Sequence, residues 1–70
     1  MEPQEIFARN VRQQRKRLGL SQEALGDASG LHMTAISRIE RAVREPRLNT
    51  IVTLARALGI TPGALLEGIE

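Results

Sequence analysis

Basic side chains outnumber acidic ones by ten to eight in this 70-residue sequence, and they fall into two groups. The first group lies early in the chain and consists of Arg9, Arg12, Arg15, Lys16 and Arg17. The second group repeats every three residues and consists of Arg38, Arg41, Arg44 and Arg47. Such clustering is typical of a protein that places one face against a polyanion. An ordinary solvated surface can have the same residues, and charge alone leaves both explanations open.

The sequence offers no set of residues for catalysis or for metal binding. It has no cysteine and a single histidine, His32, so a Cys/His pair and a His/Cys metal cluster are both excluded. No Ser/His/Asp set and no phosphate-binding glycine loop is recognisable. His32 is expected to be a helix N-cap or to lie beside a phosphate. We therefore expect no enzyme activity, no cofactor and no metal.

Residues 22–41 have the spacing of two short helices joined by a tight turn. The residues that carry this spacing are Gln22, Gly26, Gly30, Ile36 and Ile39. A glycine in mid-helix costs roughly 1 kcal/mol relative to alanine, so Gly26 indicates a close backbone contact with the neighbouring helix. Gly30 can take the positive φ that a reversal of the chain requires. This register is typical of a helix-turn-helix.

Three further helices are predicted around this motif. Pro3 is tolerated at a helix start, and the first helix is expected over residues 4–18. Another is expected over residues 48–58, with an apolar stripe formed by Leu48, Ile51, Leu54, Ala55 and Leu58. Thr61 and Pro62 are typical of the N-cap and first residue of a short fifth helix. The fold is therefore predicted to be all-α, a compact bundle of five short helices forming one domain over residues 1–70.

Two short segments of the sequence resemble those of a known family: GLSQEAL at residues 19–25 and IERAVREP at residues 39–46. They are similar to the Cro and lambda-repressor type of helix-turn-helix protein, often called the XRE family. This family includes phage repressors, restriction–modification controller proteins and many small bacterial regulators, and the resemblance extends from about Phe7 to Leu66. It implies a lambda-repressor-like fold, with the helix-turn-helix at the second and third helices. It also implies a sequence-specific DNA-binding transcriptional regulator.

The resemblance also implies which residues contact DNA, with a recognition helix over about residues 33–41 in the major groove. The residues implied as base contacts are Met33, Thr34, Ala35, Ser37 and Arg38. Those implied as contacts to the DNA backbone are Gln22, Arg41, Arg44 and Arg47. The residue types suit these roles, since arginine pairs with O6 and N7 of guanine and apolar groups contact the thymine methyl. Solvated surface side chains are the alternative.

Two structural features are implied by the same resemblance. Relatives hold a partly buried ion pair at the positions of Arg15 and Glu40, which ties the first helix to the recognition helix. The alternative is two surface charges that contribute about 0–1 kcal/mol. The family often has glycine where this chain has Ala42, so the end of the third helix is expected to be either less sharp or slightly strained.

The last six residues contain Leu65, Leu66 and Ile69, which are too many for so short a helix to bury. We therefore expect these residues to form a dimer interface, so that a homodimer binds a palindromic operator. In the alternative, Leu65 packs inward and the others fray.

The expected partners are double-stranded DNA and a second copy of the chain. No apolar run approaches the ~18 residues of a membrane span and no signal peptide is visible, so a cytoplasmic location is expected. The alternative function is that of a protein-interaction module, such as an antitoxin component or the docking domain of a longer regulator.

Overall fold

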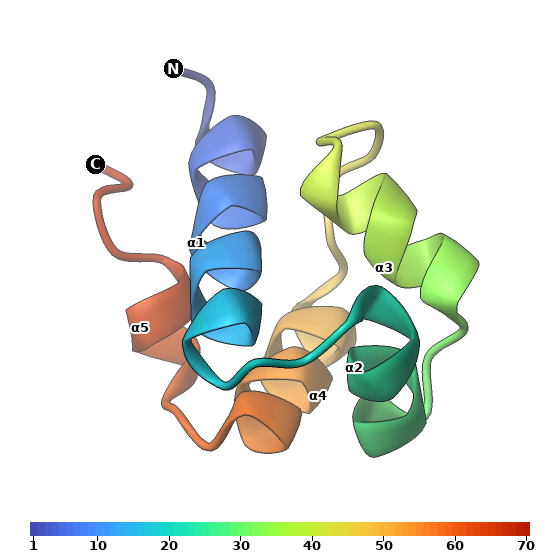
Figure 1. Cartoon of the computed structure of the whole chain (residues 1–70). Helices are drawn as coiled ribbons and strands as arrows, with labels where there is room; N and C mark the ends of the chain where they lie inside the picture. Colours follow the sequence, from blue (N-terminus) through green and yellow to red (C-terminus); the bar gives the residue numbers. More distant parts are fainter.

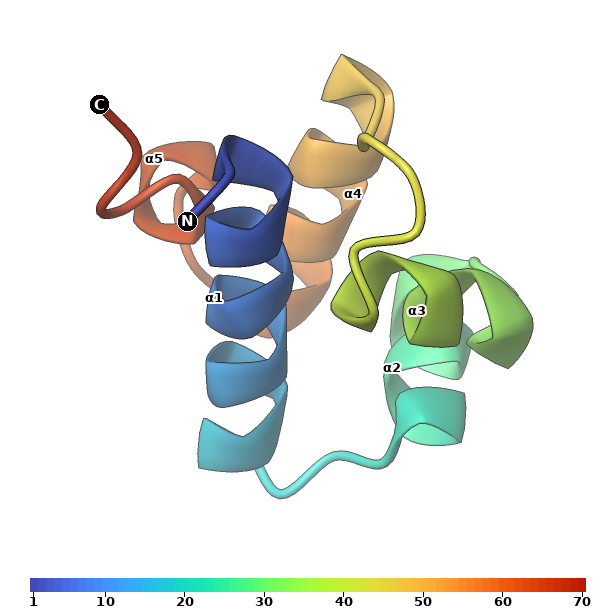
Figure 2. The same cartoon turned by 90° about the horizontal axis from the view of Figure 1, so that it is seen from above.

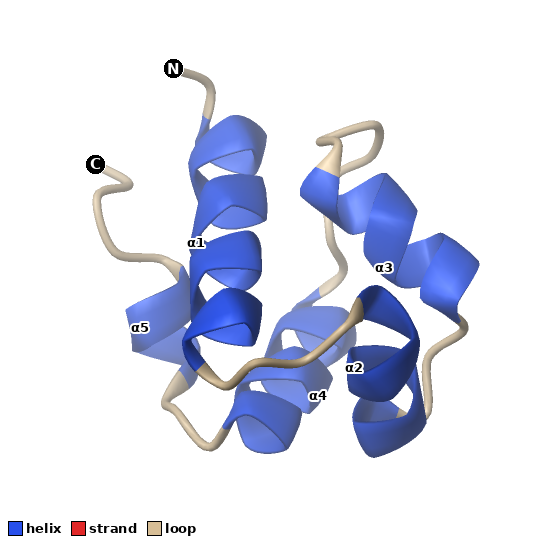
Figure 3. Ribbon diagram, in the orientation of Figure 1, coloured by secondary structure: helices blue, strands red, loops and turns tan.

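The computed structural model describes residues 1–70 and consists of five helices without strands (Figure 3). The helices are α1 (Pro3–Arg17), α2 (Gln22–Ser29), α3 (Met33–Glu40), α4 (Leu48–Leu58) and α5 (Pro62–Leu65). The predicted all-α bundle of five short helices is confirmed, with helix limits within about two residues of those expected. None of these helices has the length and apolarity needed to cross a membrane.

Helix α1 lies between α5 and α3 and also packs on α4 (Figures 1 and 2). Helix α3 packs on α2 and on α1, while α4 packs on α2 and α5. The two chain ends lie at the same end of the molecule, on the side of α1 that carries α5 (Figure 2). No helix covers the outer face of α3, which is therefore open to a partner.

Every helix contributes to a single hydrophobic core. Its fully or almost fully buried members are Phe7, Val11, Leu25, Ile36, Leu54, Ala55, Leu58 and Leu65. In a chain of this size only about 60% of the unfolded surface is buried, so each of these side chains makes up a large share of the core. The position of α3 therefore depends on packing against the other helices rather than on its own eight residues.

The turn of the helix-turn-helix depends on two glycines. A Cβ atom at Gly26 would lie 2.7 Å from the carbonyl oxygen of Leu31, closer than real Cβ atoms approach. The predicted close contact is confirmed, although its partner is the turn before α3 rather than the body of that helix. Gly30 ends α2 with φ +77°, and its N–H donates to the Gly26 carbonyl at 2.8 Å. At the other end of α2, the Ser21 hydroxyl accepts from the Ala24 N–H at 2.9 Å.

The end of α3 is strained at Ala42. This residue has φ +55°, and every other residue with positive φ in the chain is a glycine. A left-handed conformation costs roughly 1–2 kcal/mol for a residue with a Cβ atom. The expected strain at this position is therefore present.

Two apolar residues lie elsewhere than the sequence predicts. The apolar stripe predicts that Leu48 is buried, but Leu48 is the first residue of α4 and is 75% exposed. Leu65 was predicted to lie in a dimer interface, but it is 0% exposed and belongs to the core. Leu66 is the C-cap residue that follows α5, and it is 39% exposed.

Candidate nucleic-acid interface

The outward face of α3 presents the residues that the sequence predicts as base contacts. Met33, Thr34 and Arg38 are exposed, while Ala35 and Ser37 are half-buried beside them. Arg38 follows Thr34 by four positions, so the two lie one above the other on this face. The five residues therefore form one continuous surface on the helix.

The first turn of α3 is held by an unusual N-cap. The Nδ1 atom of His32 accepts a hydrogen bond from the Thr34 N–H at 3.0 Å. An imidazole nitrogen that accepts a hydrogen bond carries no proton, so Nδ1 is unprotonated in this arrangement and Nε2 is the nitrogen that can donate. His32 thereby stabilises the turn that carries Met33 and Thr34, as its predicted N-cap role requires.

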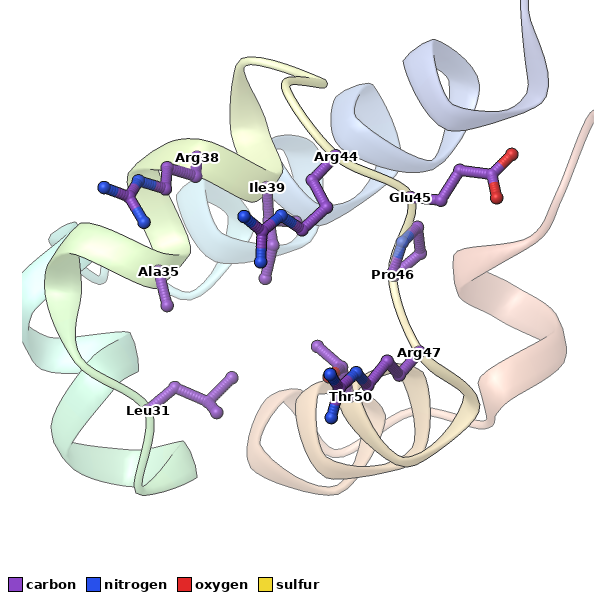
Figure 4. Close-up of a pocket in the computed structure, with 9 residues that line it drawn as sticks. All are labelled: Leu31, Ala35, Arg38, Ile39, Arg44, Glu45, Pro46, Arg47 and Thr50. Atoms are coloured by element: carbon purple, nitrogen blue, oxygen red, sulfur yellow. The ribbon is translucent and has the colours of Figure 1, made fainter.

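A hollow lies between α3, the following loop and the first turn of α4 (Figure 4). It is lined by Leu31, Ala35, Arg38, Ile39, Arg44, Glu45, Pro46, Arg47 and Thr50. The side chains of Arg44 and Arg47 extend over the hollow, whereas the Glu45 carboxylate points away from it (Figure 4). Arg38 borders the hollow from α3. The hollow is thus a shallow surface feature with three basic side chains around it.

These three arginines have no acidic partner. The ion pairs in the chain all involve Glu40, with Arg12 or Arg15, and none reaches Arg38, Arg44 or Arg47. An exposed guanidinium group without an internal partner keeps all its donors for a ligand. Three basic side chains without an acidic partner therefore surround this hollow, one from α3 and two from the loop that follows it.

Arg15 and Glu40 form a fork of hydrogen bonds between α1 and α3. Arg15 donates from Nε to Oε2 at 2.7 Å and from Nη2 to Oε1 at 2.9 Å, and its Nη1 donates to the Leu20 carbonyl at 2.8 Å. The hydrogen bonds to Glu40 raise the pKa of Arg15; burial opposes this effect, and the charge of the Glu40 carboxylate adds to it. Folding therefore favours the protonated guanidinium group. This contribution of Arg15 is fully present below the pKa of the unfolded chain and is lost as the pH rises through the raised pKa of the folded state.

Gln22 joins the same cluster. Its side-chain Nε2 donates to Oε1 of Glu40 at 3.3 Å, and the residue is half-buried. The sequence predicts Gln22 as a contact to the DNA backbone, and the structure places it at the start of α2. No acceptor in the chain takes the backbone N–H groups of Gln22 and Glu23, so these donors face solvent.

Sequence reasoning missed two residues that reach the end of α3 from α1. Arg12 donates from Nη2 to the Glu40 carbonyl oxygen at 2.9 Å, and Gln4 donates from Nε2 to the Ala42 carbonyl oxygen at 3.2 Å. A signal was available, since Arg15 follows Gln4 by eleven positions, about three helical turns, and follows Arg12 by three. All three side chains therefore lie near one face of α1. The sequence alone did not show which acceptors they would meet.

The C-terminal end of the chain is attached to α1 by a buried polar residue. Asn10 donates from Nδ2 to the carbonyl oxygens of Leu65 and Glu67, both at 2.9 Å. Leu66 and Ile69 lie just beyond, the first exposed and the second half-buried. Of the three residues predicted for a dimer interface, Leu66 is exposed, whereas Ile69 packs against the core and is only partly accessible.

The fold and this surface define a helix-turn-helix protein. A family model described as helix-turn-helix matches residues 11–65, and the chain belongs to this family. The predicted kinship with phage repressors and controller proteins is confirmed by the relatives. The chain is 46% identical over 66 residues to control protein C.SmaI of Serratia marcescens, an alignment that covers 94% of this chain and 79% of that protein.

Two solved structures show the same architecture. The restriction–modification controller protein C.AhdI of Aeromonas hydrophila superposes with a TM-score of 0.85 at 39% identity, covering 89% of this chain and 94% of that one. The c2 repressor of Salmonella phage P22, solved in complex with a synthetic operator, superposes with a TM-score of 0.80 at 37% identity over the same fractions. The family comprises transcriptional regulators, and the chain is not an enzyme.

Proposed function

We propose that this chain is a sequence-specific DNA-binding transcriptional regulator that places α3 in the major groove. The observation that carries the proposal is the exposed Arg38 on the outer face of α3, with unpaired Arg44 and Arg47 across the hollow. A guanidinium group on a recognition helix can donate two hydrogen bonds to O6 and N7 of guanine. The two loop arginines are suited to phosphates, which set the register of the protein on the duplex.

The neighbouring groups extend this interface in a consistent way. The free backbone N–H groups of Gln22 and Glu23, at the start of α2, can donate hydrogen bonds to a phosphate. Met33 is 45% exposed on α3, and such an apolar group gains more from a thymine methyl than from water. Arg41 lies at the end of α3 and supplies a further charge on the same side. The P22 repressor, which is similar in fold and sequence, was solved with an operator bound.

The proposal includes a homodimer on a palindromic operator. One recognition helix reads only a few base pairs, and a two-fold pair doubles this reading with half-sites about 10–10.5 bp apart or a multiple of that distance. Leu66 is 39% exposed, and Ile69 lies next to it in the chain end that Asn10 holds against α1. A small apolar patch on a fixed chain end is suited to pairing with its own copy across a two-fold axis.

Selection of bound sites from random duplex DNA tests this function. We expect an enriched palindrome, whose binding constant falls linearly with the logarithm of salt concentration. The Arg38→Ala variant should be carried through the same selection. It should enrich a site in which one base-pair position of each half-site has lost its preference. If the DNA bound by the wild type shares no common sequence, the proposal is contradicted and a protein-interaction module is favoured instead.

A further inference from the structure

We infer that Gln4 and Arg12 of α1 are positioning residues for the recognition helix, and that operator specificity depends on them. The inference rests on the proposed function, since it concerns how α3 is held against DNA. Both residues lie on α1, and neither is among the predicted base or backbone contacts. The argument starts from the carbonyl groups at the end of α3.

The last four carbonyl groups of an α-helix lack partners within the helix. In α3, three of these groups accept from the N–H groups that follow: Ser37 from Arg41 at 3.1 Å, Ile39 from Ala42 at 3.1 Å, and Arg38 from Val43 at 3.2 Å.

The fourth carbonyl group belongs to Glu40, and its partner is the Arg12 side chain, with Nη2 at 2.9 Å from the oxygen. The same guanidinium group has its Nε 3.8 Å from Oε1 of Glu40. A cation at this end also compensates the negative end of the helix dipole. Arg12 therefore completes the hydrogen bonding of α3 from a different helix.

Gln4 binds a carbonyl group two residues further along the chain, that of Ala42. Its Nε2 lies 3.2 Å from the carbonyl oxygen of Ala42, the residue with φ +55°. A residue with a Cβ atom keeps this conformation only when its surroundings determine it. The hydrogen bond from Gln4 is one such contact, and it spans 38 positions of sequence. Gln4 therefore stabilises the place where the chain leaves α3.

The two contacts lie at the opposite end of α3 from the His32 cap. One end of α3 is thus set by its own N-cap, and the other by side chains of α1. Base reading depends on side chains held within a fraction of an ångström, which requires supporting contacts of this kind. Loss of both contacts should let the C-terminal end of α3, with Arg38 on it, move relative to the first turn.

The test uses the double variant Gln4→Ala/Arg12→Met and a matched control, Gln13→Ala/Arg17→Met. The control removes the same residue types from α1, at exposed positions that make no hydrogen bond or ion pair to another helix. Affinity is measured at several salt concentrations for the selected operator and for a random duplex of equal length. We expect the ratio of the two affinities to fall by roughly three- to thirty-fold in the double variant and to stay unchanged in the control.

A second result is expected when Arg12 is replaced by lysine instead of methionine. Because lysine keeps a donor and a positive charge, Arg12→Lys should restore most of the ratio of operator affinity to random-duplex affinity. The salt slope should be unchanged by Gln4→Ala/Arg12→Met relative to the control. If both affinities fall equally and the slope drops by about one beyond the control, Arg12 is a phosphate contact and the inference is wrong. An unchanged ratio overturns it as well.

Amide hydrogen exchange separates this inference from the proposed function. The N–H groups of Arg41, Ala42 and Val43 report on the end of α3, and they should exchange faster in the double variant than in the control. Unchanged exchange overturns the inference whether or not the protein binds DNA. If the amides exchange faster in the double variant but the wild type shows no preference for any DNA sequence, the proposed function is wrong. The conclusion that Gln4 and Arg12 stabilise the end of α3 would then still hold.

Discussion

Arg15 donates two parallel hydrogen bonds to the carboxylate of Glu40, which connects α1 to the last residue of α3. The two distances are 2.7 Å and 2.9 Å, and the Glu40 side chain is only 2% exposed. A buried pair of this kind adds little net stability compared with apolar residues, but removal of one partner leaves a charge without compensation. The pair therefore fixes the orientation of two helices more than it stabilises the fold.

Glu40→Gln should lower the free energy of unfolding by about 3 kcal/mol, the lower end of the range for a broken buried pair. The glutamine oxygen still accepts one hydrogen bond from Arg15, which limits the loss. Glu45 points away from the hollow into solvent, so Glu45→Gln should change stability by less than about 0.5 kcal/mol. Thermal or urea unfolding of both variants checks this, and equal midpoints would show that the pair has no structural role.

Arg38→Ala should weaken operator binding by about 1–3 kcal/mol and relax preference at one base pair in each half-site. The reason is the exposed position of Arg38 on α3, with no partner inside the protein. Arg56→Ala serves as the control, because Arg56 is an exposed arginine near the end of α4 and does not line the hollow. Competition titrations against single-base operator variants measure the effect. An equal loss on operator and random DNA would assign Arg38 to phosphate.

Arg47→Ala should weaken binding to all sequences and reduce the salt slope by about one, because one counterion fewer is released. Arg47 extends over the hollow without an acidic partner, as a phosphate contact requires (Figure 4). Gln22→Ala is the uncharged comparison, and it should leave the slope almost unchanged. Fluorescence anisotropy from low to moderate salt gives both slopes. A slope in Arg47→Ala equal to that of the wild type would argue against a phosphate contact.

Leu66→Glu should give a folded monomer whose affinity for a palindrome falls steeply, while weak binding to single half-sites remains. Leu66 is exposed, so a carboxylate there leaves the core intact but opposes a copy of itself across a two-fold axis. Sedimentation at tens of micromolar tests the wild type and the variant, since a weak dimer of about −6 kcal/mol is populated there. Leu65→Glu is a contrasting variant that should unfold the chain, because Leu65 is in the core. A wild type that sediments as a monomer and binds half-sites equally well would disprove the dimer.

Ala42→Gly should raise the free energy of unfolding by about 0.5–1 kcal/mol. Glycine removes the roughly 1–2 kcal/mol cost of the left-handed conformation, and the greater freedom of the unfolded chain offsets part of this gain. The same substitution at Ala24, inside α2, should instead lower stability by about 0.5–1 kcal/mol. Urea unfolding gives both values. A destabilised Ala42→Gly would mean that the Ala42 side chain makes contacts which outweigh its strain.

The helices and the helix-turn-helix were predictable because their signals are local. Ser21 and Gly30 delimit α2 through hydrogen bonds within four residues, and Gly26 marks a contact with a turn five residues away. Helical periodicity then places Ile36 inward and Arg38 outward without reference to the rest of the chain. The sequence by itself therefore determined which elements form and which face of α3 is free.

Tertiary structure decided the contacts between distant parts of the chain. Arg12 and Gln4 reach acceptors 28 and 38 positions away, and periodicity does not define the distance or angle between two helices. Leu65 and Leu66 are equally apolar. Only the packing of α5 on α4 and α1 decides that Leu65 lies in the core and Leu66 is exposed. The physical reason is that a sequence pattern assigns a residue to a face, whereas burial and hydrogen bonding depend on what the other helices bring to that face.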